Sequence, residues 1–324
     1  MHTDLRVVTT ATTVLLALGG VADARTIYVS NEKGNSISIV DGDTLELVKE
    51  VAVGERPRGI ALSPDGKVLY ICASDDDTIQ IMDTETLEII GTLPSGPDPE
   101  VIVVSPDGKT MYAANEDDNL VTVIDVASRS VEAEIPVGVE PEGMGISPDG
   151  STIVNTSETT NMAHFIDAAS HEITHNVLVD QRPRVATFTA DGAEVWVSSE
   201  IGGTVSVIDN QTRELKHKIG FEIPGVPDEA IQPVGVGITS DRSKGFVALG
   251  PANRVAVIDA QSYEVEDYLL VGQRVWQLAF SPDEKFLYTT NGVSNDISVI
   301  DVEDEKVTKS VAVGSFPWGV AVKD

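Results

Sequence analysis

Short apolar stretches separated by polar turns recur along most of this 324-residue chain. The stretch "TIQIMD" (78–83) alternates apolar and polar residues, which is typical of a β-strand with one buried face. "RGIALS" (58–63) and "KVLYICAS" (67–74) are rich in aliphatic and aromatic residues and flank the turn "SPDG". Proline presets the first angle of such a turn and glycine supplies its left-handed position. The pattern therefore predicts an all-β chain of short strands joined by tight turns.

The same unit recurs every 42 residues. A tripeptide such as "IMD" or "VID" ends at Asp41, Asp83, Asp125, Asp167, Asp209, Asp259 and Asp301, with one interval of 50 residues. A Thr, Ser or Asp three residues after each aspartate predicts a turn closed by side chain to backbone hydrogen bonds. Each unit indicates four short strands, so seven units predict a seven-bladed β-propeller of four-stranded antiparallel blades.

The two ends of the repeated region complement each other. The first predicted strand, Thr26 to Asn31, occupies the second position of a unit, and the last, Trp318 to Val322, occupies the first. We therefore expect one blade to be made from both ends of the chain, which closes the ring and removes an open sheet edge.

Residues 1–24 have the features of a secretory signal peptide. Arg6 precedes an apolar run, and Ala22-Asp23-Ala24 is a suitable cleavage site. We expect a mature chain of residues 25–324 that is exported to the periplasm, has no membrane span and forms one propeller domain. Its single cysteine, Cys72, excludes an intrachain disulfide.

The mature chain is strongly acidic. Without residues 1–24 it keeps 21 basic and 50 acidic residues, a formal net charge of −29. Such a surface repels nucleic acid and anionic lipid, and it attracts cations or basic proteins.

Several second strands carry a recognisable motif, Tyr28-Val29-Ser30-Asn31, and more loosely Tyr112-Ala113-Ala114-Asn115 and Tyr288-Thr289-Thr290-Asn291. These units resemble YVTN repeats. With the signal peptide and seven copies, the chain resembles the exported YVTN propellers associated with catabolism dependent on pyrroloquinoline quinone (PQQ). The resemblance implies a non-enzymatic periplasmic accessory of alcohol oxidation, sometimes linked to lanthanide use. Its implied partners are a quinoprotein dehydrogenase, a cytochrome or a transport component.

One short motif suggests a different function. "HEITH" (171–175) has the H-E-x-x-H spacing of zinc proteases, which requires a helix. The repeat instead places His171 in a turn and His175 in an outer strand. Histidines four apart on a strand lie roughly 13 Å from each other, too far for one zinc ion. We therefore interpret the motif as a chance match.

A candidate site follows from residues beside a further proline that recurs once per unit, the repeat proline, at Pro57, Pro99, Pro141, Pro183, Pro233 and Pro317, with Val275 at this position in the sixth unit. Two sets of loops, those between the fourth and first strands and those between the second and third, share one face of a propeller. Their carboxylates in consecutive units predict an acidic sector of eleven residues: Asp75, Asp76, Asp77, Asp98, Glu100, Glu116, Asp117, Asp118, Glu140, Glu142 and Glu158. Crowded carboxylates need protons or a cation, and hard cations such as calcium or a lanthanide prefer oxygen ligands. An acidic rim without a bound ion is the alternative.

The other sector of this face is predicted to be basic and aromatic. It carries Arg182, Arg184, Arg274, Trp276 and Trp318, and together with Arg58 these are the candidate ligand-binding residues. Arginine binds carboxylates in bidentate fashion and tryptophan offers a flat stacking surface, which would suit the planar polycarboxylate PQQ. The tryptophans could equally plug the channel.

The sequence leads to three hypotheses about function. The first is a non-enzymatic periplasmic protein that binds calcium, a lanthanide or a metal–PQQ complex at this polarised face. The second is a scaffold whose acidic face docks a basic redox partner. The third is a metal-dependent lactonase, although the sequence offers no convincing catalytic base. The eight extra residues within "GFEIPGVPDEAIQP" (220–233) are either a lid on the same face or a surface insertion.

Overall fold

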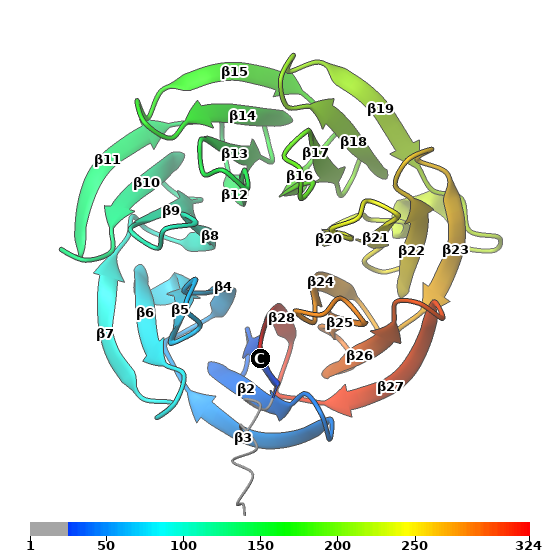
Figure 1. Cartoon of the computed structure of the whole chain (residues 1–324), viewed down its shortest axis with the longest axis horizontal. Helices are drawn as coiled ribbons and strands as arrows, with labels where there is room; N and C mark the ends of the chain where they lie inside the picture. The colour runs from blue at the N-terminus through cyan, green and yellow to red at the C-terminus, as the bar shows by residue number, and fades with distance from the viewer. Residues whose placement is uncertain (1–24) are drawn as a thin grey trace, which may run out of the picture.

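The computed structural model describes residues 25–324, which form a ring of seven four-stranded antiparallel blades (Figure 1). This confirms the predicted seven-bladed β-propeller. The predicted signal peptide, 1–24, lies outside the described residues. Within 25–324 no helix has the length and hydropathy needed to cross a membrane. The helical segments described there are two short 3-10 turns, η1 (Ser74–Asp76) and η2 (Asp228–Ala230).

Each blade takes its name from its inner strand. The inner strands are β4 (Pro57–Leu62), β8 (Pro99–Val104), β12 (Pro141–Ile146), β16 (Pro183–Phe188), β20 (Val236–Ile238), β24 (Val275–Phe280) and β28 (Pro317–Lys323). The second strands are β1 (Thr26–Asn31), β5 (Val68–Ala73), β9 (Thr110–Asn115), β13 (Thr152–Ser157), β17 (Glu194–Ser199), β21 (Lys244–Ala248) and β25 (Phe286–Asn291).

The outermost strand of each blade is its most exposed strand, whereas the third strand is largely buried. The third strands are β2 (Ser36–Asp41), β6 (Thr78–Asp83), β10 (Leu120–Asp125), β14 (Met162–Asp167), β18 (Thr204–Asp209), β22 (Arg254–Asp259) and β26 (Asp296–Asp301). The outer strands are β3 (Glu46–Ala52), β7 (Ile89–Pro94), β11 (Ser130–Pro136), β15 (Ile173–Leu178), β19 (Leu215–Gly220), β23 (Val265–Leu270) and β27 (Lys306–Ala312).

The ring closes as the sequence predicts. β28 pairs with β1 in the order β28-β1-β2-β3, so the blade is made from both ends of the chain. Its core is shared with the neighbouring β24 blade, where Ile27 and Val29 pack with Tyr288, Ile297 and Val299. Because each apolar cluster is built from the faces of adjacent blades in this way, one blade cannot bury its apolar surface alone.

The repeat turns have the predicted hydrogen bonds. In the first SPDG turn, Ser63 Oγ donates to Asp65 Oδ1 at 2.7 Å and Gly66 adopts a φ of +66°. In the VID-type turn of the β4 blade, Asp83 Oδ1 accepts from the Thr86 N–H at 2.7 Å. These local bonds explain why the VID-type Asp recurs in all seven units and why Gly recurs at the left-handed position of four of them, Gly66, Gly108, Gly150 and Gly192.

A repeated hydrogen bond between consecutive blades orients the loops at the candidate-site face. The residue just before an inner strand has a left-handed φ of 49–58° in six units: Arg56, Asp98, Glu140, Arg182, Arg274 and Phe316. The N–H of each donates to a side chain that ends the preceding blade's second-to-third-strand loop, as from Arg182 to Asn161 Oδ1 at 3.1 Å. The equivalent acceptors are Asn35, Asp77, Asn119, Asn253 and Asn295. This link between consecutive blades sets where each side chain leaves its loop.

The HEITH segment is not helical. His171 lies in a turn with a φ of +58°, and His175 is exposed on the outer strand β15, where it pairs with Phe165. The interpretation of this motif as a chance match is confirmed, because no helix presents both histidines on one face.

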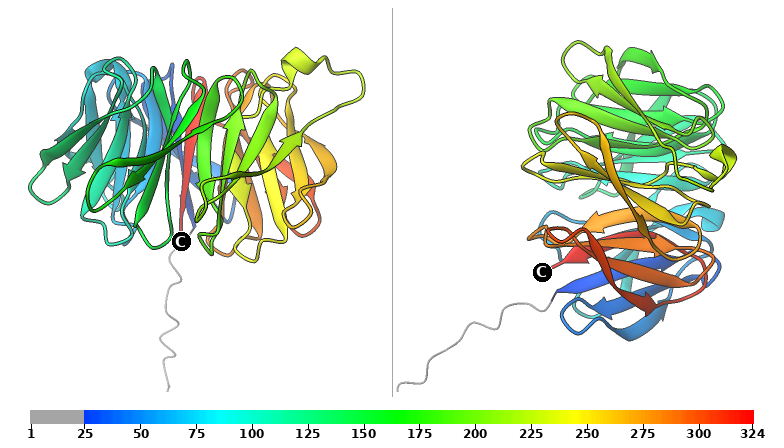
Figure 2. Two further views of the ribbon diagram at one scale, coloured as in Figure 1. Left: turned by 90° about the horizontal axis from the view of Figure 1, so that it is seen from above. Right: turned by 90° about the vertical axis from the view of Figure 1, so that its right-hand side faces the viewer.

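The insertion at 220–233 is anchored at the periphery. Its residues Ile223 and Ile231 are buried in the cluster of Trp196 and Val236. The Glu222 N–H donates to the Tyr268 hydroxyl at 3.0 Å. Figure 1 shows the insertion projecting outward beside β23, and Figure 2 places it on the face opposite the C-terminus. The segment is therefore a surface insertion on the expected face, and it does not cover the channel.

Candidate functional site at one mouth of the channel

The first residues after the inner-strand prolines converge on one mouth of the central channel. Glu100, Glu142, Arg184 and Trp318 are each at most 3 % exposed, although their strands belong to four different blades. Proline is the first residue of five inner strands, β4, β8, β12, β16 and β28, so these four side chains leave their strands at equivalent positions. Their role as ligands remains a prediction of the sequence.

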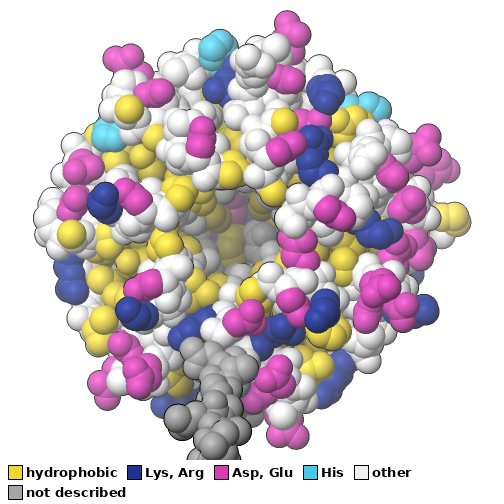
Figure 3. All heavy atoms as spheres, viewed as in Figure 1, with side chains coloured by type: hydrophobic (Ala, Val, Ile, Leu, Met, Phe, Trp, Pro, Cys, Tyr) yellow, Lys and Arg dark blue, Asp and Glu magenta, His cyan; other side chains and the backbone are white. Residues whose placement is uncertain are grey.

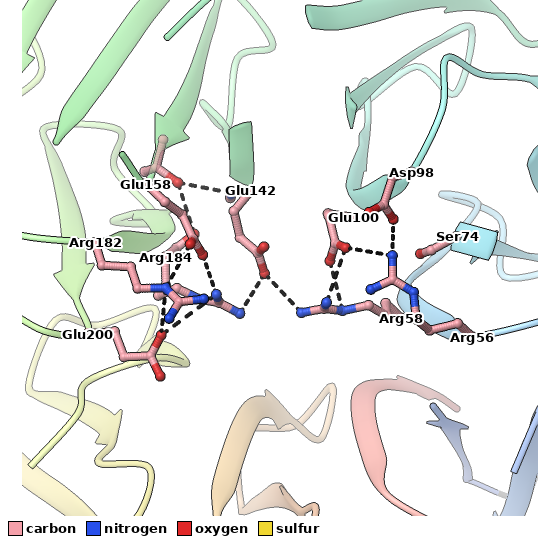
Figure 4. Close-up of polar contacts among 12 residues, drawn as sticks. Arg56, Arg58, Ser74, Asp98, Glu100, Glu142, Glu158, Arg182, Arg184 and Glu200 are labelled. Carbon is pink, nitrogen blue, oxygen red and sulfur yellow. Dashed lines mark hydrogen bonds and ion pairs between the residues drawn. The ribbon is translucent and has the colours of Figure 1, made fainter. Parts of the chain in front are cut away.

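Glu142 connects two arginines across the mouth. Its Oε1 lies 2.7 Å from Arg184 Nη2 and 3.4 Å from Arg58 Nη2 (Figure 4). Arg58 also donates from Nη1 to Glu100 Oε1 at 3.1 Å. Arg58 Nε lies 2.7 Å from Glu100 Oε2, but the two atoms are not aligned for a hydrogen bond. Both are buried and make no other hydrogen bond to a described residue. The chain of ion pairs therefore links the β4, β8, β12 and β16 blades.

A second group of ion pairs extends this chain around the ring. Glu158 binds both Arg184 and Arg182, with 2.7 Å from Arg182 Nε to Glu158 Oε2. Glu200 is 2 % exposed, and its Oε1 lies 2.8 Å from Arg274 Nη2. The Glu142–Arg184–Glu158 contacts and the approach of Arg182 to Glu200 are drawn in Figure 4.

The two tryptophans stack on the arginines of this chain. Arg58 Cζ lies 4.8 Å from the ring centroid of Trp318, and Arg274 Cζ lies 4.2 Å from that of Trp276. Such contacts add a cation–π attraction to the ion pairs. The mouth is consequently lined by one continuous set of paired charges and aromatic rings.

These contacts correct one expectation from the sequence. The predicted separation into an acidic and a basic sector is wrong, because Arg182 and Arg184 bind Glu142 and Glu158 of the supposed acidic sector. The loop that carries Glu158 belongs to the β12 blade and lies beside the loop that enters β16. Arginine and glutamate therefore alternate around this part of the mouth.

The environment of Arg184 holds this arginine in its charged form. Burial lowers the pKa of Arg184, but the nearby Glu142, Glu158 and Glu200 outweigh burial and raise it above its ordinary value. For Glu158 the effect of burial is larger than that of Arg184, and the pKa of this carboxyl is raised. Arg184 therefore keeps its charge, while burial makes the Glu158 carboxyl harder to ionise.

Three carboxyl groups form the strongest candidate for a cation site. Asp98, Glu100 and Glu116 each offer an oxygen within 4.8 Å of the others, and they are the one such group of metal-ligating side chains among residues 25–324. The buried Glu100 and the half-buried Glu116 each offer one of these oxygens. Arg56 contacts both Asp98 and Glu100, the latter at 3.3 Å from Nη2 to Oε1. Three carboxyl groups therefore lie beside two arginines, Arg56, which contacts two of the carboxyl groups, and Arg58, which contacts Glu100.

The other predicted acidic ligands have different roles. Asp75 pairs with Arg56 at 2.6 Å. Asp76 accepts from the Glu55 N–H of the loop that enters β4 at 2.9 Å, and Asp77 accepts from the Asp98 N–H of the following loop at 3.0 Å. Glu140 accepts a hydrogen bond from the Thr159 hydroxyl. Asp117 and Asp118 are exposed. The structure therefore brings only part of the predicted acidic set together.

Glu200 is a site residue that the sequence reasoning missed. It follows the second strand β17 directly, as Glu116 and Glu158 follow β9 and β13, and the three are 42 residues apart. The repeat register alone could have identified it. Arg56, which directly precedes the repeat proline Pro57, is a second site residue outside the predicted set.

The acidic cluster predicts a pH-dependent stability. Burial, followed by the charges of Glu142 and Asp98, raises the pKa of Glu116. A carboxyl with a raised folded-state pKa contributes its full stability below the unfolded pKa of about 4.3, and this contribution is lost as the pH rises through the folded-state pKa. In chelator, Glu116→Gln should therefore be more stable than the wild type at pH 8 and similar to it at pH 4.

Urea unfolding at both pH values measures this difference. Asp117→Asn, at the exposed tip of the same loop, is the matched control and should keep the wild-type profile. A wild type and Glu116→Gln variant of equal stability at pH 8 would contradict this account of the cluster.

Comparison with known proteins supports the fold. A model described as "Lactonase, 7-bladed beta-propeller" matches residues 16–88, and a "YNCE-like beta-propeller" model matches residues 72–146. No curated protein matches the chain.

Among solved structures, the chain is similar to hydrazine synthase of Kuenenia stuttgartiensis, with 24% identity and a TM-score of 0.79 over 86% of this chain and 92% of that one. It is also similar to a functionally unknown protein from Desulfotomaculum acetoxidans, with 19% identity and a TM-score of 0.78 over 92% and 98%. The dihydro-heme d1 dehydrogenase NirN shares 15% identity and a TM-score of 0.69 over 91% and 74%. At these identities the similarities establish the propeller fold.

Proposed function

We propose that this chain is a non-enzymatic, exported accessory protein that binds a hard cation, calcium or a lanthanide, with Asp98, Glu100 and Glu116. The observation that carries the proposal is the grouping of these three carboxyl groups, whose ligand atoms lie within 4.8 Å of one another. Carboxylates this close repel each other unless a proton or a cation neutralises them.

The spacing of the cluster is compatible with one ion. Calcium binds oxygen at 2.3–2.6 Å, so two ligands on opposite sides of it lie up to about 5 Å apart. The ligand atoms of the cluster lie within 4.8 Å of one another. An ion that binds there competes with Arg56 for Asp98 and Glu100, which favours a trivalent over a divalent charge.

The geometry favours a cation over PQQ alone. The arginines predicted to hold its carboxylates already have partners, since Arg58 binds Glu100 and Glu142 while Arg184 binds three glutamates. A polycarboxylate would have to displace these glutamates. PQQ therefore enters the proposal as a metal complex. The role beside PQQ-dependent alcohol oxidation and the periplasmic location remain predictions of the sequence resemblance.

Calorimetric titration of residues 25–324, freed of metal by chelator, tests the proposal. Calcium chloride, lanthanum chloride, PQQ and an equimolar lanthanum–PQQ mixture are the four ligands. We expect lanthanum to bind more tightly than calcium, and Glu116→Gln to weaken both by roughly tenfold or more. Glu116 is chosen because it lies outside the arginine chain, so its replacement leaves those ion pairs intact. Asp117→Asn is the control.

Two outcomes would overturn the proposal. One is no heat from either cation. The other is equal cation affinity in the wild type and Glu116→Gln. The lactonase model that matches residues 16–88 supports an enzymatic alternative. The same metal-loaded samples are therefore assayed with aliphatic lactones. Turnover that chelator abolishes and Glu116→Gln reduces would replace the accessory role by hydrolysis.

A further inference from the structure

The loops that enter the inner strands are held by a second repeated hydrogen bond, which lies within each blade. In four blades among residues 25–324, the N–H of a glycine three positions before the repeat-proline position donates to a side chain of the third strand. The donors are Gly54, Gly138, Gly272 and Gly314, and the acceptors, in the same order, are Gln80, His164, Ser298 and Ser38. Of these four acceptors only the imidazole of His164 changes its charge between pH 5 and 8.

His164 is buried in the middle of its blade. On the face drawn in Figure 3 the visible histidine side chains lie near the outer edge of the ring, whereas His164, on β14, is 6 % exposed. Its Nε2 accepts from the Gly138 N–H at 3.0 Å, so this nitrogen carries no proton. Nδ1 lies 2.6 Å from Asn176 Oδ1 and therefore donates to it. These two bonds fix the neutral tautomer that is protonated on Nδ1.

The loop 137–140 lies directly over this ring. A Cβ added to Gly138 would lie 2.9 Å from His164 Nε2, a close approach that favours glycine at this position. At the other end of the loop the Glu140 N–H donates to Asn119 Oδ1 of the preceding blade at 3.0 Å. The loop is thus held at two points, by His164 and by Asn119, before it enters β12.

Protonation of His164 is incompatible with the first of these bonds. With a proton on Nε2, the imidazole and the Gly138 N–H are two donors that face each other. Ser157 Oγ lies 3.1 Å from Nε2 and offers an acceptor for the added proton. Its own hydroxyl hydrogen is directed to Asn155 Oδ1 at 3.4 Å. The charged ring therefore has a partner, while the Gly138 N–H loses its acceptor.

No charged residue stabilises the protonated ring. Burial lowers the pKa of His164, and the hydrogen bond to Asn176 only partly opposes this effect. The charged or titratable residues on the loop and strands packed around β14 are Glu140, Glu158, Asp167, His175 and Arg184. They have other partners or are exposed: Glu158 pairs with Arg184, Glu140 accepts from the Thr159 hydroxyl, Asp167 closes its turn, and His175 lies on the surface.

We propose that His164 is a pH-sensitive switch that releases the loop 137–140 when its imidazole takes up a proton. Because this loop leads into β12, its release also loosens Glu142, which bridges Arg58 and Arg184 at the mouth of the channel. Acidification is thereby transmitted from a buried ring to the ion pairs of the mouth. The switch requires no bound cation and is independent of the proposed cation site.

The direction of the pH effect follows from the lowered pKa. In the unfolded chain the pKa of a histidine is about 6.5, and in the folded protein the pKa of His164 lies below it. Above about pH 6.5 the ring is neutral in both states and costs no stability. As the pH falls from there toward the folded-state pKa, the unfolded chain binds the proton first, so the folded state loses stability. Below the folded-state pKa the folded protein binds the proton and the loop is released.

Selective isotope labelling tests the proposal on residues 25–324 in chelator. All four loop glycines follow a valine, so carbonyl-¹³C valine with ¹⁵N glycine singles out their amides in an NMR spectrum. The ¹⁵N shifts of labelled histidine report the tautomer and charge of His164. Between pH 8 and 4.5 we expect the Gly138 amide to change with the same midpoint as His164. Its protection from hydrogen exchange, corrected for the intrinsic pH dependence, should fall about tenfold or more, as for a buried donor without an acceptor. Gly54, Gly272 and Gly314 should stay protected.

The chain itself supplies the matched variant. His164→Gln introduces the residue that holds Gly54 at the equivalent position of the β4 blade, and it should keep Gly138 protected over the whole pH range. His175→Gln, on the exposed outer strand, is the control and should keep the wild-type transition. Circular dichroism confirms that each protein is folded at each pH.

Four outcomes would overturn the proposal. A Gly138 transition that persists in His164→Gln would assign it to a carboxyl such as Glu140 or Glu158. A His164 ring that stays neutral to pH 4.5 in the folded protein would exclude the switch. Loss of protection at all four glycines together would mean global unfolding. Different midpoints for His164 and Gly138 in the wild type would separate the two events, and this comparison needs no variant.

Discussion

Replacing Arg184 by methionine is expected to destabilise the protein by about 3–5 kcal/mol, the usual cost of removing one partner from a buried ion pair. Arg184 is 3 % exposed and lies within 4 Å of Glu142, Glu158 and Glu200. Without its guanidinium these carboxylates stay buried with less positive charge beside them. Urea unfolding at pH 7, followed by circular dichroism, measures the loss of stability.

A surface ion pair provides the control for this substitution. Lys109 and Asp107 lie 2.9 Å apart, but their side chains are 76% and 56% exposed. Lys109→Met should therefore cost less than about 1 kcal/mol. The double variant Arg184→Met/Glu142→Leu should recover part of the loss, because it removes a carboxylate together with its partner. A cost below about 1 kcal/mol for Arg184→Met would show that the ion pairs contribute little to stability.

Replacing Gly143 by alanine is expected to cost about 3 kcal/mol or more, at the upper end for overpacking of a core. Its added Cβ would lie 1.7 Å from the carbonyl oxygen of Arg184, so β12 and β16 must move apart. That movement also displaces Glu142 from Arg184. The variant should therefore lose stability and weaken the ion pairs at the mouth.

The same unfolding experiment compares two glycine-to-alanine changes. A Cβ added to Gly220 would meet no heavy atom within 4 Å, and this glycine has no positive φ, so Gly220→Ala should be nearly neutral. Equal stability of Gly143→Ala and Gly220→Ala would mean that the inner strands of the β12 and β16 blades separate easily.

The repeat carried enough information to predict the fold. Four strands, a turn at each SPDG and a turn at each VID-type aspartate follow from local bonds that each unit forms within itself. Ring closure also follows, because the first and last strands are complementary parts of one unit. The H-E-x-x-H spacing at 171–175 could be rejected for the same reason, since the register assigns it to a strand.

Which side chains meet at the channel was only partly predictable. The repeat proline identified Glu100, Glu142, Arg184 and Trp318 as residues of the mouth, since each follows that proline. It could not show that Glu142 bridges Arg58 and Arg184, because Arg58 lies 84 positions away and two blades distant. For this reason the sequence could not show that ion pairs join the predicted acidic and basic sectors.

The sequence by itself determined the number of blades, their strand order, the closure of the ring and the face on which the candidate residues gather. These features depend on hydrogen bonds and apolar patterns within one 42-residue unit. Only the tertiary structure decided which charges are paired and that Asp98, Glu100 and Glu116 form one cluster. The physical reason is that these contacts depend on the tilt and closeness of neighbouring blades, which no single repeat encodes.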